Sequence, residues 1–171
     1  MSPEEEVVAL FQTVEKHLGP PEALVNNAGI LDLQTRVDSM NAERIQRIFA
    51  VNVTGSFLCA REAVKRMSTK YGGKGGSIVN LSSGAAKYGS PGEYVDYAAS
   101  KAAIDTLTIG LAREVAEEGI RVNAVRPGFI DTEIHQSGGE PDRMERVRPL
   151  VPMKRVGQAK EGCGCNHVAA F

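Results

Sequence analysis

A tyrosine and a lysine four residues apart are the side chains best suited to chemistry in this chain. Tyr97 and Lys101 belong to the stretch Tyr-Ala-Ala-Ser-Lys, which follows a Gly-Ser-Pro turn and leads into a helical run over 102–116. Residues at this spacing share one helix face, so the ammonium can favour the phenolate and lower the tyrosine pKa from about 10. Such a tyrosine can exchange a proton near neutral pH. The same spacing also occurs where a ring packs and a lysine is solvated.

Four further motifs accompany this pair in a fixed order along the chain. They are Asn26-Asn27-Ala28-Gly29 after a short apolar run, Asn52 within a helical pattern, Ser82-Ser83 at the end of one apolar run, and Pro127-Gly128 at the end of another. Each has a simpler interpretation, since asparagine, glycine and proline favour turns and Asn52 can be an ordinary polar helix residue. An amide among apolar neighbours nevertheless needs partners, and a bound water is one way to supply them. The whole set favours a catalytic site.

Helices and strands alternate around these motifs. Helical periodicity is predicted over 4–18, from an N-cap at Asn41 to residue 67, and over 97–116, whereas 23–25, 78–81 and 121–125 are short apolar runs typical of buried strands. The glycine-rich stretch 72–77 precedes a strand, so it is a linker turn and not a phosphate-binding loop. This alternation predicts an α/β fold with right-handed crossovers and a parallel sheet, and ligands at the carboxyl ends of its strands.

With these motifs in place, the chain resembles the short-chain dehydrogenase/reductase family, and most closely its bacterial glucose- or alcohol-type oxidoreductases. The resemblance covers about residues 4–160, so we expect one domain over 1–160 and an atypical, disordered tail over 161–171. It implies a Rossmann-like doubly wound parallel sheet and hydride transfer between a nicotinamide and a small-molecule alcohol or carbonyl.

The resemblance assigns a catalytic role to four residues. Tyr97 matches the proton donor and acceptor, and Lys101 matches the residue that lowers its pKa and binds the nicotinamide ribose. Ser83 matches the hydroxyl that binds the substrate oxygen, and Asn52 matches the asparagine that holds a water in a proton relay. Ser82 competes with Ser83, because the fourteen residues from Ser83 to Tyr97 exceed the family's commonest spacing by one. An extra residue within 84–93 would have to bulge outward.

The implied cofactor is NAD or NADP. The resemblance places it against Asn26, Ala28, Gly29, Tyr97, Lys101, Pro127, Gly128, Ile130 and Thr132. The stretch 133–153 matches the family's mobile substrate lid, in which His135, Met144 and Leu150 line a pocket or simply pack. Family members commonly form tetramers, so a homo-oligomer, tetramer or dimer, is implied as well.

The chain also departs from the family pattern at both ends. The strand, glycine-rich turn and helix that bind the pyrophosphate in this family have no counterpart here, and the ending after Gly162 resembles a changed reading frame. We therefore expect an incomplete fold, truncated at both ends, with the strand at 23–25 left at an open sheet edge. The alternative to an active oxidoreductase is an inactive remnant that at most binds other subunits.

The composition of the chain argues against several other classes of protein. A net charge of −1 and scattered lysines and arginines argue against a nucleic-acid partner. No run approaches the roughly 18 apolar residues of a membrane span, and the acidic start resembles no secretory signal, so a cytoplasmic location is predicted. Cys163, Cys165 and His167 would supply fewer than the four ligands of a structural zinc site, so no metal is predicted.

Overall fold

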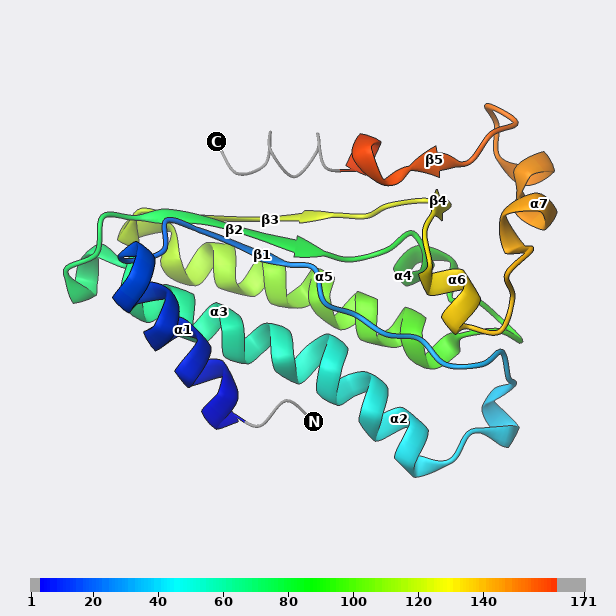
Figure 1. Cartoon of the computed structure of the whole chain (residues 1–171), viewed down its shortest axis with the longest axis horizontal. Helices are drawn as coiled ribbons and strands as arrows, with labels where there is room; N and C mark the ends of the chain where they lie inside the picture. The colour runs from blue at the N-terminus through cyan, green and yellow to red at the C-terminus, as the bar shows by residue number, and fades with distance from the viewer. Residues whose placement is uncertain (1–3, 163–171) are drawn as a thin grey trace.

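The computed structural model describes residues 4–162, which form a parallel sheet covered by helices (Figure 1). The sheet has the strand order β1 (Ala23–Asn26), β2 (Gly76–Leu81) and β3 (Ile120–Val125), with both pairs parallel. The three predicted strands are confirmed. Within the described residues β1 is an outer strand, and its Val25 is 46% exposed.

Four helices pack along one side of this sheet in Figure 1. They are α1 (Glu4–Leu18), α2 (Ala42–Phe49), α3 (Gly55–Met67) and α5 (Val95–Val115). Their apolar sides enclose the core with alternate residues of the strands, because successive strand side chains point to opposite faces of a sheet. The core cluster comprises Val7, Phe11, Ala63, Met67, Ile78, Val115, Ile120 and Val122.

Shorter elements follow the strands at their carboxyl ends. They are α4 (Ala85–Tyr88), β4 (Ile130–Asp131), α6 (Ile134–Ser137), α7 (Arg143–Val147) and β5 (Gly157–Gln158). β4 and β5 pair in parallel as a separate two-stranded sheet. Within residues 4–162 there are also four 3-10 turns, at Val37–Ser39, Thr69–Tyr71, Ala116–Glu118 and Arg148–Leu150.

The predicted long helix from Asn41 to residue 67 is wrong in one respect, because a π-helical turn divides it. Its start is confirmed, since Asn41 Oδ1 accepts a hydrogen bond of 2.9 Å from the Arg44 N–H and caps α2. The helix then widens over Ala50–Thr54 before α3 begins. Asn52 lies in this wider turn, and such turns are frequent at functional sites.

The glycine-rich stretch before β2 is a turn, as predicted. Gly75 has φ +83°, and a Cβ there would lie 2.5 Å from the Gly119 carbonyl oxygen. Only glycine allows the two turns to approach so closely.

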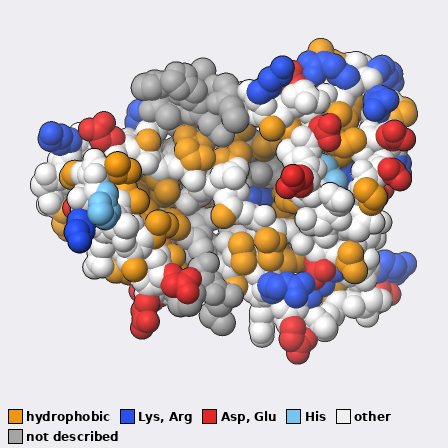
Figure 2. All heavy atoms as spheres, in the orientation of Figure 1, with side chains coloured by type: hydrophobic (Ala, Val, Ile, Leu, Met, Phe, Trp, Pro, Cys, Tyr) orange, Lys and Arg blue, Asp and Glu red, His pale blue; other side chains and the backbone are white. Residues whose placement is uncertain are grey.

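Charged side chains of both signs alternate around the rim of the face shown in Figure 2, and apolar side chains gather nearer its centre. Among residues 4–162, no helix combines the length and apolarity needed to cross a membrane. The tail predicted as disordered begins at residue 161, but residues 161 and 162 are helical. The rest of it, with Cys163, Cys165 and His167, lies outside the described residues.

Candidate active site

Tyr97, Lys101 and Ser83 meet where β2 ends. Tyr97 and Lys101 lie on the first turns of α5, and Ser83 follows β2 by two residues. Lys101 Nζ donates a hydrogen bond of 2.7 Å to the carbonyl oxygen of Leu81 and lies 5.7 Å from the centre of the Tyr97 ring. The Ser83 side chain lies close enough to the Tyr97 hydroxyl to lower the Tyr97 pKa. Three of the four predicted catalytic side chains are thus neighbours.

The prediction that Lys101 lowers the Tyr97 pKa is wrong for this structure. Burial raises the Tyr97 pKa, and the nearby Ser83 side chain offsets this only in part. Burial also lowers the pKa of Lys101, which is 4% exposed, to about 8. Desolvation disfavours the charged form of both groups. At neutral pH the site therefore holds a protonated phenol.

The two serines after β2 have different surroundings. Ser82 is 4% exposed, and its Oγ donates a hydrogen bond of 3.1 Å to the carbonyl oxygen of Lys101, which ties α5 to the strand. Ser83 is half-buried, and its Oγ accepts the Ala85 N–H at 3.1 Å. Ser83, and not Ser82, is the hydroxyl that lies against Tyr97.

The longer spacing between Ser83 and Tyr97 is taken up by an exposed loop. α4 occupies its first part, and Tyr88 at its end is 74% exposed. Gly89 and Gly92 follow with φ of +75° and +73°, and Ser90 with +46°. Tyr88, Gly89 and Gly92 are exposed, so this part of the segment lies at the surface, and the bulge of an extra residue stays a prediction.

Asn52 is held by protein groups on every side. Its Nδ2 donates to the carbonyl oxygen of Ile30 at 2.9 Å and to Ser100 Oγ at 3.0 Å, and its Oδ1 accepts the Ile30 N–H at 2.8 Å. Ser100 Oγ in turn donates to the carbonyl oxygen of Tyr97 at 2.7 Å. Asn52 thereby links the loop after β1 to the helix of Tyr97. The water relay stays a prediction, because the amide bonds seen here are made to Ile30 and Ser100.

Asn26 lies inside the fold and Gly29 lies at the site. Asn26 is 9% exposed, and its Nδ2 donates to Asn80 Oδ1 at 2.9 Å and to the carbonyl oxygen of Ser56 at 3.3 Å. It therefore joins β1 to β2 and α3. Ala28 is exposed, and a side chain at Gly29 would place its Cβ 3.2 Å from Lys101 Nζ.

The remaining predicted cofactor residues all follow β3, but they lie in two different places. The carbonyl oxygen of Pro127 accepts the Gly84 N–H at 2.9 Å, so Pro127 and Gly128 lie beside the residue that follows Ser83. Ile130 lies on β4 and Thr132 directly after it, both farther along the chain from β3.

The predicted lid is fixed to the start of α5 by charged and polar contacts. The Tyr94 hydroxyl donates to the carbonyl oxygen of Gly138 at 3.1 Å. Arg143 bridges Glu93 at 2.7 Å and Glu140 at 3.0 Å. These contacts hold the lid beside the helix that carries Tyr97.

A surface cavity of about 320 Å³ lies along this lid. Its lining includes both His135 and Met144, whereas Leu150 is 73% exposed. The other lining residues are Asp131, Thr132, Glu133, Gln136 and Pro141. The Nε2 of His135 lies 2.9 Å from the carbonyl oxygen of Ile130, so this histidine also steadies the lid.

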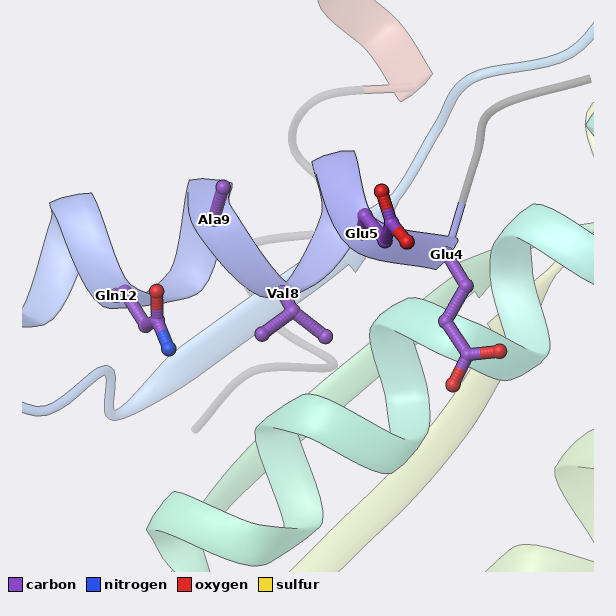
Figure 3. A pocket seen from close by; sticks show the side chains of 5 residues that line it. All are labelled: Glu4, Glu5, Val8, Ala9 and Gln12. Atoms are coloured by element: carbon purple, nitrogen blue, oxygen red, sulfur yellow. The ribbon is translucent and has the colours of Figure 1, made fainter.

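A second pocket, of about 610 Å³, is formed by residues of α1 alone and contains none of the predicted site residues (Figure 3). Its lining is Glu4, Glu5, Val8, Ala9 and Gln12. In the part of the chain that the structure describes, no cluster of three or more histidine, cysteine or acidic side chains could hold a metal ion.

Several residues that organise the site are not evident as site residues from the sequence. Asn80 is fully buried on β2, and its Nδ2 donates to Thr108 Oγ1 at 2.9 Å. A polar residue inside the apolar run 78–81 was the signal that could have revealed it. Ser100, within the Tyr97 motif, is buried too.

The family model described as short chain dehydrogenase matches residues 1–142. The curated protein "Uncharacterized oxidoreductase YgfF" of Escherichia coli strain K12 is 63% identical over 161 residues, which are 94% of this chain and 65% of that protein. "Glucose 1-dehydrogenase 2" of Bacillus subtilis strain 168 is 35% identical over 94% of this chain and 61% of its own length. The chain belongs to the short-chain dehydrogenase family, as its motifs predicted.

Solved structures agree with this assignment. A short-chain type dehydrogenase/reductase from Mycobacterium marinum superposes with a TM-score of 0.89 at 34% identity, over 98% of this chain and 64% of that one. A structure described as ElxO with NADP bound gives 0.86 at 30% identity, over 99% and 67%. The chain spans 61% and 65% of the two curated relatives named above. The described fold is thus part of the larger Rossmann-like fold, which confirms the predicted fold class.

Proposed function

We propose that this chain carries the proton-transfer half of an NAD(P)-dependent oxidoreductase that acts on a small alcohol or carbonyl compound. The observation that carries the proposal is the grouping of Tyr97, Ser83 and a buried Lys101 where β2 ends. Membership in the short-chain dehydrogenase family supports it.

Lys101 and Gly29 fit a nicotinamide cofactor. The ammonium has three N–H groups, so it can bind ribose hydroxyls while it donates to Leu81. The missing side chain of Gly29 leaves room next to that ammonium, which a Cβ would reduce. The cofactor, when bound, would supply or accept the hydride. The neighbours with NADP or NADPH bound support this cofactor class.

The proton would be handled by the chain's own residues. Ser83 Oγ would hold the substrate oxygen next to the Tyr97 hydroxyl, as expected of a hydroxyl that stabilises developing charge. Because burial keeps the Tyr97 phenol protonated, it is ready to donate to a carbonyl oxygen during reduction. Lys101, with a pKa of about 8, could then return a proton to Tyr97.

Titration of the purified chain with NADH and NADPH, followed by nicotinamide fluorescence, tests the proposal. Saturable binding that Lys101→Ala weakens, with Tyr97→Phe as the proton-transfer control, is expected. Lys70→Ala is the matched control, because Lys70 Nζ lies 5.6 Å from the ring of the exposed Tyr71. Absence of binding by the folded chain would overturn the proposal and favour the inactive remnant, for which the comparisons offer no support.

We further propose a homo-oligomer, dimer or tetramer, and a cytoplasmic location. Phe57 on α3 and Ile109 on α5 are 49% and 54% exposed, and such apolar side chains suit a contact between subunits. Sedimentation equilibrium over a range of concentrations would test the assembly, and a monomer at every concentration would contradict it.

A further inference from the structure

An ion pair that is almost entirely buried lies directly beside Tyr97. Arg44 of α2 and Asp96 of α5 have side chains that are 10% and 2% exposed. Arg44 Nε donates to Asp96 Oδ2 at 2.6 Å, and Nη2 lies 3.4 Å from Oδ1. Burying two charges has a large desolvation cost, so a buried pair is weak evidence of stabilisation alone. Its other contacts indicate a different role.

Each partner holds a second segment of the site. Arg44 Nη1 donates to the carbonyl oxygen of Leu33 at 2.5 Å, on the loop that runs from β1 past Gly29. Asp96 Oδ1 accepts the backbone N–H of Tyr97 at 2.9 Å. The first N–H groups of a helix lack partners within the helix, so this bond fixes the turn from which the tyrosine projects. The arginine fork is planar and rigid, so it sets direction as well as distance.

We propose that Arg44 and Asp96 are a positioning pair for Tyr97, which sets the first turn of α5 against α2 and the loop after β1. The catalytic meaning of that placement rests on the proposed function. Ser83 and Lys101 also lie beside the Tyr97 side chain, with Lys101 Nζ 5.7 Å from the centre of its ring. Arg44 and Asp96 would act on it through the backbone.

Charge-conserving variants test this placement without altering the local charge. The tyrosines are labelled with ¹³C at Cζ, and the signal of Tyr97 is identified as the one that Tyr97→Phe removes. The pH titration of this signal is then followed by NMR in the unaltered chain and in Arg44→Lys and Asp96→Glu. If the pair positions Tyr97, a displaced first turn should let water reach the phenol. Its titration midpoint should then fall by about half a pH unit or more towards that of an ordinary tyrosine.

The pair of Arg126 and Asp105, whose side chains are 57% and 16% exposed, provides the matched control. Asp105 lies on the same helix, and Arg126 Nε bonds to both of its carboxylate oxygens at 3.0 Å. Arg126→Lys and Asp105→Glu should leave the Tyr97 midpoint unchanged. An unchanged midpoint in Arg44→Lys and Asp96→Glu, with only a lower melting temperature, would overturn the proposal. Failure of both to fold would do so too, because the pair would then be a requirement of folding.

The same samples separate this inference from the proposed function. A shifted Tyr97 midpoint in a chain that binds no NADH or NADPH would support the positioning pair and contradict the proposed activity. Cofactor binding in a chain whose Tyr97 midpoint does not shift in the two variants would support the proposed activity and contradict the positioning pair.

Discussion

Lys101 Nζ donates a hydrogen bond of 2.7 Å to the backbone carbonyl oxygen of Leu81, the last residue of β2. A lysine that is 4% exposed is thus anchored to the end of the central strand and not to a carboxylate. A carbonyl oxygen compensates only part of the desolvation of an ammonium, so burial lowers the Lys101 pKa to about 8.

The first prediction concerns stability at alkaline pH. An unfolded lysine stays protonated up to about 10.4, whereas folded Lys101 releases its proton near 8. The unfolded state therefore binds more protons between these values, and the unfolding free energy should rise with pH across them, by about 3 kcal/mol from Lys101. Lys101→Met should remove this rise in urea unfolding curves recorded at pH 7.5 to 10.

The difference in unfolding free energy between the wild-type chain and Lys101→Met isolates the contribution of Lys101 from those of other groups. One of these is Tyr97, whose raised pKa lowers the unfolding free energy as the pH rises further. Lys70→Met, at an exposed lysine, should retain the wild-type rise. A wild-type unfolding free energy that falls steadily from pH 8 to 10, with Lys101→Met following the same curve, would contradict the prediction.

The second prediction separates the two serines after β2. Ser83→Ala removes the hydroxyl that contacts Tyr97, and turnover of a carbonyl substrate found by screening should fall by about 10²–10³-fold at nearly unchanged stability. Ser82→Ala removes the tie to the carbonyl oxygen of Lys101, and the unfolding free energy should fall by about 1–2 kcal/mol. Steady-state kinetics and chemical unfolding check both. The reverse pattern would make Ser82 the substrate-binding hydroxyl.

The strands and the catalytic motif could be predicted from the sequence, but the local geometry and the protonation of the site could not. The positions of the strands and of Tyr97 and Lys101 follow from local periodicity, so they could be predicted. The π-helical turn at Asn52 could not, because an i→i+5 bond leaves no distinct pattern of side chains. The direction of the Tyr97 pKa shift depends on burial, which only the folded chain defines.

Contacts between residues far apart in the sequence could not be predicted either. Arg44 and Asp96 are 52 residues apart, and nothing in either local pattern marks them as partners. The choice between Ser82 and Ser83 required the direction of each hydroxyl, since both follow the same strand.

A third prediction concerns acid stability and rests on Glu62 of α3, which is 3% exposed. Burial pushes its pKa upward, but hydrogen bonds from Lys65, Arg66 and Arg61 outweigh burial and lower the pKa to about 2. A depressed carboxyl pKa stabilises the fold above the unfolded value and loses that contribution as the pH falls towards 2. The loss should amount to about 3 kcal/mol between pH 5 and 2.

Glu62→Gln should flatten this part of the stability profile, measured by urea unfolding between pH 5 and 2.5. Glu117→Gln, at an exposed glutamate, is the matched control and should retain the wild-type slope. Equal slopes in all three chains would show that Glu62 is not a source of acid sensitivity.

The last prediction uses two glycines with different surroundings. A Cβ at position 29 would lie 3.2 Å from Lys101 Nζ and 3.6 Å from Asn52 Oδ1, so Gly29→Ala should press on the ammonium where the ribose would bind. Affinity for NADPH or NADH should fall by about tenfold, which corresponds to about 1.4 kcal/mol.

A Cβ at position 110 would meet nothing within 4 Å in the exposed middle of α5. Gly110→Ala should therefore raise the unfolding free energy by about 0.5–1 kcal/mol and leave cofactor affinity unchanged. Fluorescence titration and thermal unfolding of both variants distinguish the two effects, and equal cofactor affinity in both would mean that the space beside Lys101 is not part of the cofactor site.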